Sequence, residues 1–425
     1  MQALHLFENS WSNKISSILL FCVPFFFIIF ADSLLSFIFP IVVADTLKSN
    51  GLMGLIMAAS SVVGLICDFT FPQLFKTKSW KFFLLGAIIL AFTFPIAIYL
   101  GKEFTLAWAF LYGSVIWGVY FEFIMFSEQL FVVNEDNKIN YSKDWALISL
   151  TWQTTSIIAP ILASALLLSS IQNTTLTIVI IQAMALMFAI FVIFSIKNKR
   201  NGFVNDESYK YKVNVLTELK YWKVLLVRVW PTVSVGIIIT AIQAAFWTIG
   251  GIYGIQVFGE SGMEWLIISL FFFPMILGSL IITKLKPQKS KQKISQISLI
   301  FGALVLGCIA FAGDNHLLIV SIIVLASFLL SFVQPLNDAV YSDLLDRLGE
   351  QRSHLLGISR ANSSIAYILT PIFVGFISDL IGYSATFGLI AIISALVGIV
   401  TFFFSPKLIK LPQGQLKEIS ETDIN

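Results

Sequence analysis

Two carboxylates stand inside apolar stretches of this chain, where an ionised group is costly. Asp32 lies in the middle of the stretch 15–43, and Glu122 lies in the stretch 104–130. A charge near the centre of a bilayer costs on the order of 3 kcal/mol or more, so each needs a partner, a water-filled cavity or a protonation step. A carboxylate held away from water takes up a proton more readily. We therefore predict that both residues exchange protons or recognise a cation; the alternative is a structural hydrogen bond between helices.

Uncharged polar side chains recur at helical spacing in similar stretches. Gln153 lies in the fifth stretch, Gln243 and Trp247 lie in the seventh, and Gln334 and Asp338 lie in the tenth. Residues four apart share a helix face, so each of the last two pairs forms a stripe. These stripes are predicted to contact a substrate. The alternatives are hydrogen bonds between helices for the glutamines, ordinary packing for the tryptophan and exposure to water for the aspartate.

The elements that must position these residues are membrane-spanning helices. The chain is 57% hydrophobic and 12% charged, with a mean hydropathy of +0.88, which lies outside the range of soluble domains. A helix needs about 20 apolar residues to cross hydrocarbon. The stretches of that approximate length are 15–43, 51–74, 80–100, 104–130, 144–169, 174–196, 224–254, 263–284, 294–313, 316–341, 353–380 and 383–405. The composition and these lengths predict twelve transmembrane helices.

The second half of the chain repeats the first at an offset of 211 to 216 residues. LLGAIILAF at 84–92 returns as IFGALVLGC at 300–308, and APILAS at 159–164 returns as TPIFVG at 370–375. This repeat predicts an all-α membrane protein of two six-helix bundles related by a pseudo-two-fold axis along the membrane normal. The predicted boundaries are an N-terminal bundle at 1–196, a cytoplasmic linker at 197–223, a C-terminal bundle at 224–405 and a cytoplasmic tail at 406–425.

The distribution of Lys and Arg predicts the topology. With the N-terminus in the cytoplasm, Lys48 and Lys102 are the basic residues of the outer loops, and the others lie inside. This bias is what the positive-inside rule expects, so both termini are predicted to be cytoplasmic, in the cell membrane. The formal net charge of +3 is explained by topology and implies a lipid bilayer, not a nucleic acid, as the partner.

Two motifs resemble a known family. The segment from Gly64 through Asp68 to Lys76 resembles the loop signature of the major facilitator superfamily, although it keeps only some of the residues of that signature. The segment 342–387, with Pro371 and Gly375, looks like the same superfamily's loop and eleventh helix. Phe69 stands where the family usually has a basic residue, which leaves the coupling ion open.

The fifth stretch carries a further similarity. Ala159 and Pro160 belong to a run with small residues at the positions where antiporters of this superfamily have glycine. Small residues let helices approach closely, and a proline lets a helix bend. The run therefore has two interpretations, an antiporter signature or ordinary small-residue packing.

The resemblance implies where the substrate-binding site lies and where a cytoplasmic gate would close. Helices one, four, seven and ten line a central cavity in this family, and the repeat places Glu122 and Gln334 at equivalent positions of the two halves. Charged residues at inner helix ends are predicted to hold the inner side shut in one state, or to be solvated charges that obey the topology rule. They are Asp68, Lys76, Asp343, Arg352 and Arg360.

Together these features predict a secondary active transporter of a small solute that works by alternating access. Proton coupling is expected, and an acidic midplane with aromatic neighbours favours export of amphipathic or cationic compounds. The alternatives are a nutrient or metabolite importer or facilitator, and a non-transporting sensor or lipid-handling protein of the same fold. We expect no catalytic residue, no metal and no cofactor. The protein is expected to be a monomer.

Overall fold

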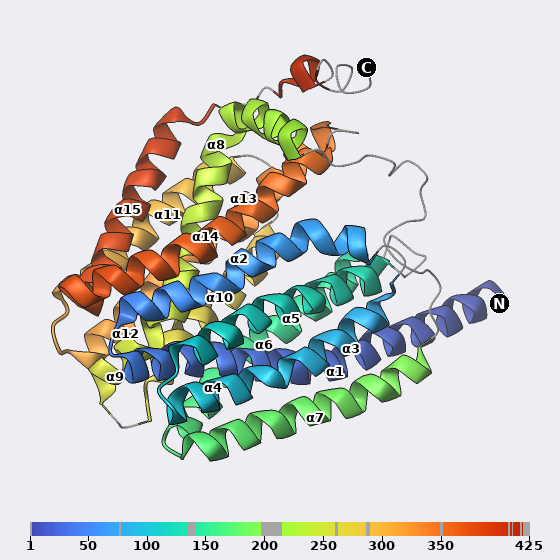
Figure 1. Cartoon of the computed structure of the whole chain (residues 1–425). Helices are drawn as coiled ribbons and strands as arrows, with labels where there is room; N and C mark the ends of the chain where they lie inside the picture. The colour runs from blue at the N-terminus through green and yellow to red at the C-terminus, as the bar shows by residue number, and fades with distance from the viewer. Residues whose placement is uncertain are drawn as a thin grey trace. The chain divides into compact units, whose positions relative to one another are not determined.

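The protein is all-helical in the part of the chain that its computed structural model describes, namely residues 2–75, 78–133, 141–196, 215–259, 262–285, 290–348, 352–406, 409, 411–416 and 419 (Figure 1). The first half contains α1 (Gln2–Leu47), α2 (Asn50–Leu74), α3 (Trp80–Ala91), α4 (Thr93–Glu103), α5 (Ala107–Val133), α6 (Tyr141–Leu167) and α7 (Ile171–Ser195). The second half contains α8 (Val215–Ala245), η2 (Phe246–Gly250), α9 (Gly251–Phe258), α10 (Trp265–Leu285), α11 (Lys291–Gly307), η3 (Cys308–Phe311), α12 (His316–Leu330), α13 (Val333–Leu348), α14 (Arg352–Ile381) and α15 (Tyr383–Phe404).

These helices form twelve segments long and apolar enough to cross a membrane, counted over the described residues. They run from Ser17–Leu47 to Tyr383–Phe404, and each overlaps one of the twelve predicted stretches, with ends that differ by at most six residues. Helices are expected because hydrocarbon offers no partner for backbone N–H and C=O groups, which a helix satisfies within itself. The predicted fold class is confirmed. Between the two halves, α8 begins at Val215, so the last part of the predicted linker 197–223 is helical.

The chain divides into two compact units that follow the two halves of the sequence, with a small exchange. Unit 1 comprises Met1–Ser49, Ala59–Glu207 and Glu260–Trp265, and unit 2 comprises Asn50–Ala58, Ser208–Gly259 and Leu266–Asn425. The first turns of α2 thus belong to unit 2, and the segment before α10 belongs to unit 1. Within unit 1, α1 packs against α6 and α7 while α5 packs against α3 and α4; within unit 2, α14 packs against α8, and α11 against α15.

Hydrogen bonds fix both exchanged segments. In unit 2 the Asp379 carboxylate accepts bonds from the backbone N–H groups of Asn50 (3.1 Å) and Gly51 (2.8 Å). These are free N–H groups of the first turn of α2, where a negative charge also meets the positive end of the helix dipole. In unit 1 the Ser164 hydroxyl lies 2.7 Å from the Glu264 carboxylate. Side chains of α14 and α6 thus bond each segment to the unit to which it belongs.

The third span is broken in a way the sequence analysis did not predict. Stretch 80–100 was expected as one helix, but α3 ends at Ala91 and α4 starts at Thr93. Pro95 has no N–H to donate to the carbonyl of Ala91, four residues earlier. The fully buried Gln182 of α7 donates to that carbonyl instead, at 3.0 Å. A buried glutamine thus replaces the bond that the proline removes.

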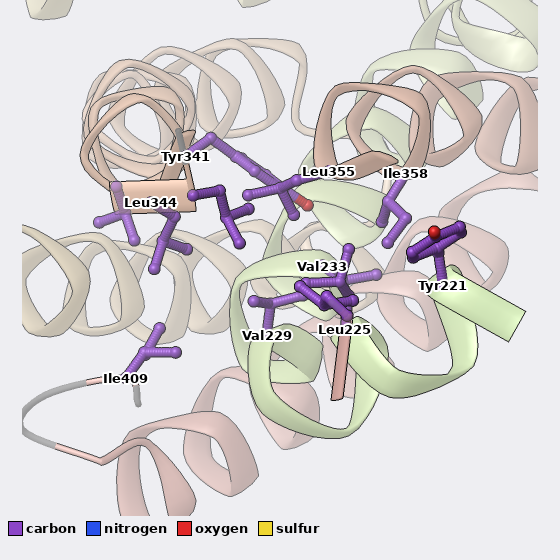
Figure 2. Packing of buried hydrophobic residues seen from close by; sticks show 12 residues of the cluster. Tyr221, Leu225, Val229, Val233, Tyr341, Leu344, Leu355, Ile358 and Ile409 are labelled. Atoms are coloured by element: carbon purple, nitrogen blue, oxygen red, sulfur yellow. The ribbon is translucent and has the colours of Figure 1, made fainter. Parts of the chain in front are cut away.

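A buried apolar cluster joins the beginnings of α8 and α14 to the end of α13 in unit 2 (Figure 2). Residues of the C-terminal tail complete it: Ile409 is 5% exposed and Leu416 is fully buried. Arg347 of α13 donates to the Ile409 carbonyl at 2.6 Å, and Gln413 donates to the Arg347 carbonyl at 2.7 Å. The described part of the predicted tail 406–425 is therefore packed against unit 2.

Candidate functional site

Asp32 of α1 is buried inside unit 1, with 4% of its surface exposed. Its Oδ1 atom accepts two hydrogen bonds from α5, one from Trp117 Nε1 at 2.9 Å and one from the Tyr120 hydroxyl at 2.8 Å. Within the described residues the carboxylate makes no ion pair, and Oδ2 accepts no hydrogen bond. The arrangement therefore holds one oxygen in place and leaves the other available to carry a proton.

Aromatic packing positions the two donors. The Trp117 ring stacks on Phe94 with centroids 5.4 Å apart and meets the edge of Phe39 at 5.9 Å. Tyr120 is fully buried and lies one turn after Trp117 on α5. Sequence reasoning missed both donors. Their spacing of three on the helix that carries Glu122 is a signal that would have suggested them as partners of an intramembrane acid.

Removing one donor tests whether Asp32 depends on it. Tyr120→Phe keeps the ring and deletes only the hydroxyl, so we expect the folded protein to lose about 1–2 kcal/mol of stability. The measurement is the thermal unfolding midpoint in detergent. Tyr112→Phe, the same change at a half-exposed position of α5, is the matched control. Equal midpoints for the two variants would contradict an ordering role for the Tyr120 hydroxyl.

Glu122 of α5 lies against the backbone of α2. A Cβ atom added at Gly64 would meet Glu122 Oε1 at 3.0 Å, and one added at Gly118 would meet the Ser60 carbonyl oxygen at 2.2 Å. The glycines let the two helices approach closely enough for the carboxylate to rest on α2. The structure thus brings together two residues of the predicted set, Gly64 and Glu122. Glu122 is half-buried and makes no hydrogen bond to Asp32.

A third intramembrane acid was missed by the sequence analysis. Glu128 of α5 is 3% exposed, and its Oε2 accepts a hydrogen bond from Trp152 Nε1 of α6 at 3.0 Å. Glu128 stands near the end of the predicted stretch 104–130, where a carboxylate is expected to reach water, so nothing in the sequence marked it as buried. Beside Trp152, the predicted site residue Gln153 is half-buried and donates to Ser149 Oγ at 3.1 Å.

In unit 2 the polar stripes of α8 and α13 meet. Gln243 Nε2 donates to Gln334 Oε1 at 2.9 Å. Trp247 lies in the π-helical turn η2 and its ring is 5.2 Å from that of Phe272 of α10. Single π turns inside helices are frequent at functional sites. Asp338 is exposed, one turn after Gln334 on α13. That Glu122 and Gln334 share one cavity stays a prediction.

The charged residues that were predicted to form the cytoplasmic gate have different surroundings in the structure. Asp343 forms an ion pair with Lys291 at 2.7 Å, both in unit 2, and its side chain is 57% exposed, so the pair contributes little stability. Asp68 is half-buried and Arg360 is exposed. Lys76 and the side chain of Arg352 lie outside the described residues. That these charged residues hold the inner side shut in one state stays a prediction.

The predicted packing residues occupy close helix contacts. Ala159 is fully buried beside Pro160 in α6. In unit 2, Cβ atoms added at Gly375 of α14 and Gly54 of α2 would lie 2.3 Å from the Asn50 carbonyl oxygen and 2.1 Å from the Pro371 carbonyl oxygen, respectively. Backbone meets backbone at this crossing, so the small residues serve helix packing here.

Groups for other chemistry are sparse in the described residues. They contain no cluster of three His, Cys, Asp or Glu side chains that could hold a metal ion. His354 of α14 lies 2.8 Å from the Glu218 carboxylate of α8, and its ring stacks on Tyr221 with centroids 3.8 Å apart. This histidine is held in a packing contact beside the cluster of Figure 2.

Comparison with known proteins supplies the family context. The sequence profile of the Major Facilitator Superfamily matches residues 140–351 and 266–421. No curated protein sequence matches the chain.

Solved structures share the fold at low identity. A peptide transporter POT in complex with sulfate has a TM-score of 0.73 at 11% identity, over 93% of this chain and 95% of that one. The nucleoside transporter NupG has a TM-score of 0.69 at 12% identity, over 92% and 100%. A bacterial homolog of the human lysosomal transporter Spinster, inward-facing and unoccupied, has a TM-score of 0.68 at 10% identity, over 97% and 98%. At these identities the likeness shows the fold alone.

Proposed function

Because the chain belongs to the major facilitator superfamily, we propose that it is a secondary active transporter that moves a small solute by alternating access and couples this movement to protons. The observation that carries the proposal is Asp32, a carboxylate buried in the first span without a cationic partner among the described residues. A charge in this position is costly, and reversible protonation removes the cost. The family membership supports transport, and Asp32 supports the coupling.

The chemistry at Asp32 follows from its two donors. Trp117 and Tyr120 both donate to Oδ1, and both are neutral, so they can stay in place whether or not Oδ2 carries a proton. We propose that Oδ2 binds a proton from one side of the membrane and releases it to the other side, as the protein alternates between its two conformations. Glu122, half-buried against Gly64, is the second candidate for this role.

The solute is proposed to be neutral, cationic or amphipathic. The ionisable groups in the middle of the spans, Asp32 and Glu122, are acidic, and Asp338 adds a third carboxylate nearer the end of its span; together they disfavour anions. The antiporter-like run at Ala159 and Pro160 favours export. A second candidate, a facilitator without ion coupling, is favoured by the two hydrogen bonds of Asp32, because they also suit a purely structural carboxylate.

The membrane topology completes the proposal. The chain is an integral, multi-pass membrane protein with twelve candidate spans in its described residues. We propose that both termini are cytoplasmic and that the protein works as a monomer in the cell membrane, in agreement with the bias of Lys and Arg toward the inner loops.

Proton coupling is tested in proteoliposomes that contain a pH-sensitive dye and the purified protein. A solute library is first screened for compounds whose addition moves protons. For such a compound, we expect an imposed pH gradient to drive accumulation by the wild type and not by Asp32→Asn. Exchange of labelled for unlabelled solute without a gradient should persist in this variant, because binding and alternation need no net proton movement. Glu122→Gln is measured in parallel.

The control is Asp45→Asn, the same change at an exposed aspartate that pairs with Lys48 at 2.8 Å. Gradient-driven accumulation should survive in this control. Full accumulation in both Asp32→Asn and Glu122→Gln would remove these residues from the coupling. Exchange by the wild type with no response to a gradient would select the facilitator.

A further inference from the structure

The two glutamines of unit 2 leave part of their hydrogen-bonding capacity unused. One N–H of Gln243 is given to Gln334 Oε1 at 2.9 Å, and Gln243 Nε2 lies 3.7 Å from Met275 Sδ. Within the described residues neither amide makes another hydrogen bond. Gln243 Oε1 therefore offers an acceptor, and the NH2 group of Gln334 offers donors. If the oxygen and nitrogen atoms of both amides were assigned the other way round, Gln334 would donate to Gln243. The pair would then still offer one acceptor oxygen and one donor NH2 group.

The exposure of this pair bears on the surroundings that it needs. Gln334 is exposed, and Asp338, one turn later on the same face of α13, is exposed too. Both lie inside the tenth candidate span, His316–Leu345. A primary amide and a carboxylate turned toward acyl chains would have no partners, which is strongly unfavourable. This face of α13 is therefore expected to meet water or a solute.

Apolar side chains border the pair. Trp247 follows Gln243 by four residues and shares its face of the helix, and Phe272 precedes Met275 by three residues on α10. The rings of Trp247 and Phe272 are 5.2 Å apart, and both are half-buried. A flat ring can pack on such an aromatic surface. No charged residue occurs in 229–258 or 265–282, the parts of the seventh and eighth spans that carry these side chains.

From this geometry we infer that unit 2 recognises a neutral, flat solute whose edge carries a hydrogen-bond donor beside an acceptor, as in an aryl carboxamide or a lactam. The donor of the solute meets Gln243 Oε1, its acceptor meets the Gln334 NH2 group, and its ring packs on Trp247 and Phe272. Asp338 excludes the corresponding anion. The inference rests on the proposed transport function and names the substrate class.

Three ring-matched probes test this edge: benzamide offers one donor group and one acceptor, benzamidine offers donors only and is a cation, and benzoate offers acceptors only and is an anion. Binding to the full chain in detergent is measured by saturation-transfer NMR. Because one well-placed hydrogen bond changes affinity by about tenfold, benzamide should bind the wild type at least about tenfold more tightly than either other probe.

Substitutions at Gln334 should change this order in defined ways. Gln334→Leu should weaken benzamide about tenfold. Gln334→Glu can still accept from Gln243 but offers no donor, so benzamidine should become the preferred probe. Gln256→Leu, an exposed glutamine of α9, is the matched control and should keep the wild-type order. The thermal unfolding midpoint of each variant confirms that it is folded.

Several results would overturn the substrate class: a wild-type preference for benzamidine or benzoate, no saturable benzamide signal at about 10 mM, or an unchanged order in folded Gln334→Glu. These results leave the coupling experiment on Asp32 unaffected. Conversely, the predicted order in a protein that moves no solute in proteoliposomes would retain the binding site and reject the transporter.

Discussion

Replacing Gly54 with valine is expected to abolish the accumulation of folded protein. A Cβ atom at this position of α2 would lie 2.1 Å from the carbonyl oxygen and 2.8 Å from the carbonyl carbon of Pro371 in α14. Both are backbone atoms, which cannot turn aside as a flexible side chain can. Overpacking of side chains in a core costs about 1–3 kcal/mol. Here the helices themselves must separate, so we expect a loss of more than about 3 kcal/mol.

Separation of α2 from α14 would also break the contacts next to Gly54. The Asp379 carboxylate accepts from the backbone N–H of Gly51 at 2.8 Å, and the Tyr383 hydroxyl donates to Asn50 Oδ1 at 3.1 Å. These bonds need the same close approach, so their loss adds to the steric cost. The expected effect therefore exceeds that of an ordinary glycine substitution inside a helix.

The Gly54 prediction is checked by fluorescence-detected size-exclusion chromatography of a fusion protein and by thermal unfolding of any soluble fraction. The matched control is Gly414→Val, because a Cβ added at Gly414 has no neighbour within 4 Å. The control should elute like the wild type, while Gly54→Val should aggregate or fail to accumulate. A monodisperse Gly54→Val protein with a wild-type unfolding midpoint would show that α2 and α14 do not pack in this way.

Replacing Leu225 with aspartate is expected to have the second-largest effect. Leu225 of α8 is fully buried in the apolar cluster that also holds Leu344, Leu355 and the tail residue Ile409 (Figure 2). Leu416 of the tail belongs to the same cluster. A carboxylate there loses its water, and the surrounding leucines and isoleucines offer no partner. The loss of the apolar side chain and the burial of an unpaired polar group together cost several kcal/mol.

Leu219→Asp provides the control for this substitution. Leu219 is on the same helix, six residues earlier, and is 53% exposed. The same chemical change there should leave the unfolding midpoint within a few degrees of the wild type. In Leu225→Asp we expect a large drop and, because Ile409 packs on the same cluster, rapid proteolysis of the tail. Equal midpoints and an equally protected tail would contradict the packing of the tail against α8.

The candidate site separates what single residues of the sequence can indicate from what depends on packing; the role of Asp32 in coupling stays a prediction. Asp32 was predicted because an acid in an apolar stretch is anomalous by itself, without knowledge of its neighbours. Trp117 and Tyr120 were not predicted, because tryptophan and tyrosine are common in membrane helices and only the packing of α1 against α5 turns them into donors. Glu128 was missed for a related reason: the donor of its hydrogen bond, Trp152, lies on another helix.

The sequence by itself determined the number of spans, the helical fold class and the doubled six-helix plan. Hydrocarbon requires each segment to be long enough to cross the bilayer and to satisfy its backbone hydrogen bonds within itself, and both requirements can be recognised in the sequence of one segment. The doubled plan can be recognised because similar segments recur at a nearly constant offset. Only the tertiary structure decided that Asp379 caps the start of α2, that Gln182 compensates for Pro95, and that the tail closes an apolar cluster. Each of these contacts joins residues far apart in the chain, where no periodicity links one partner to the other.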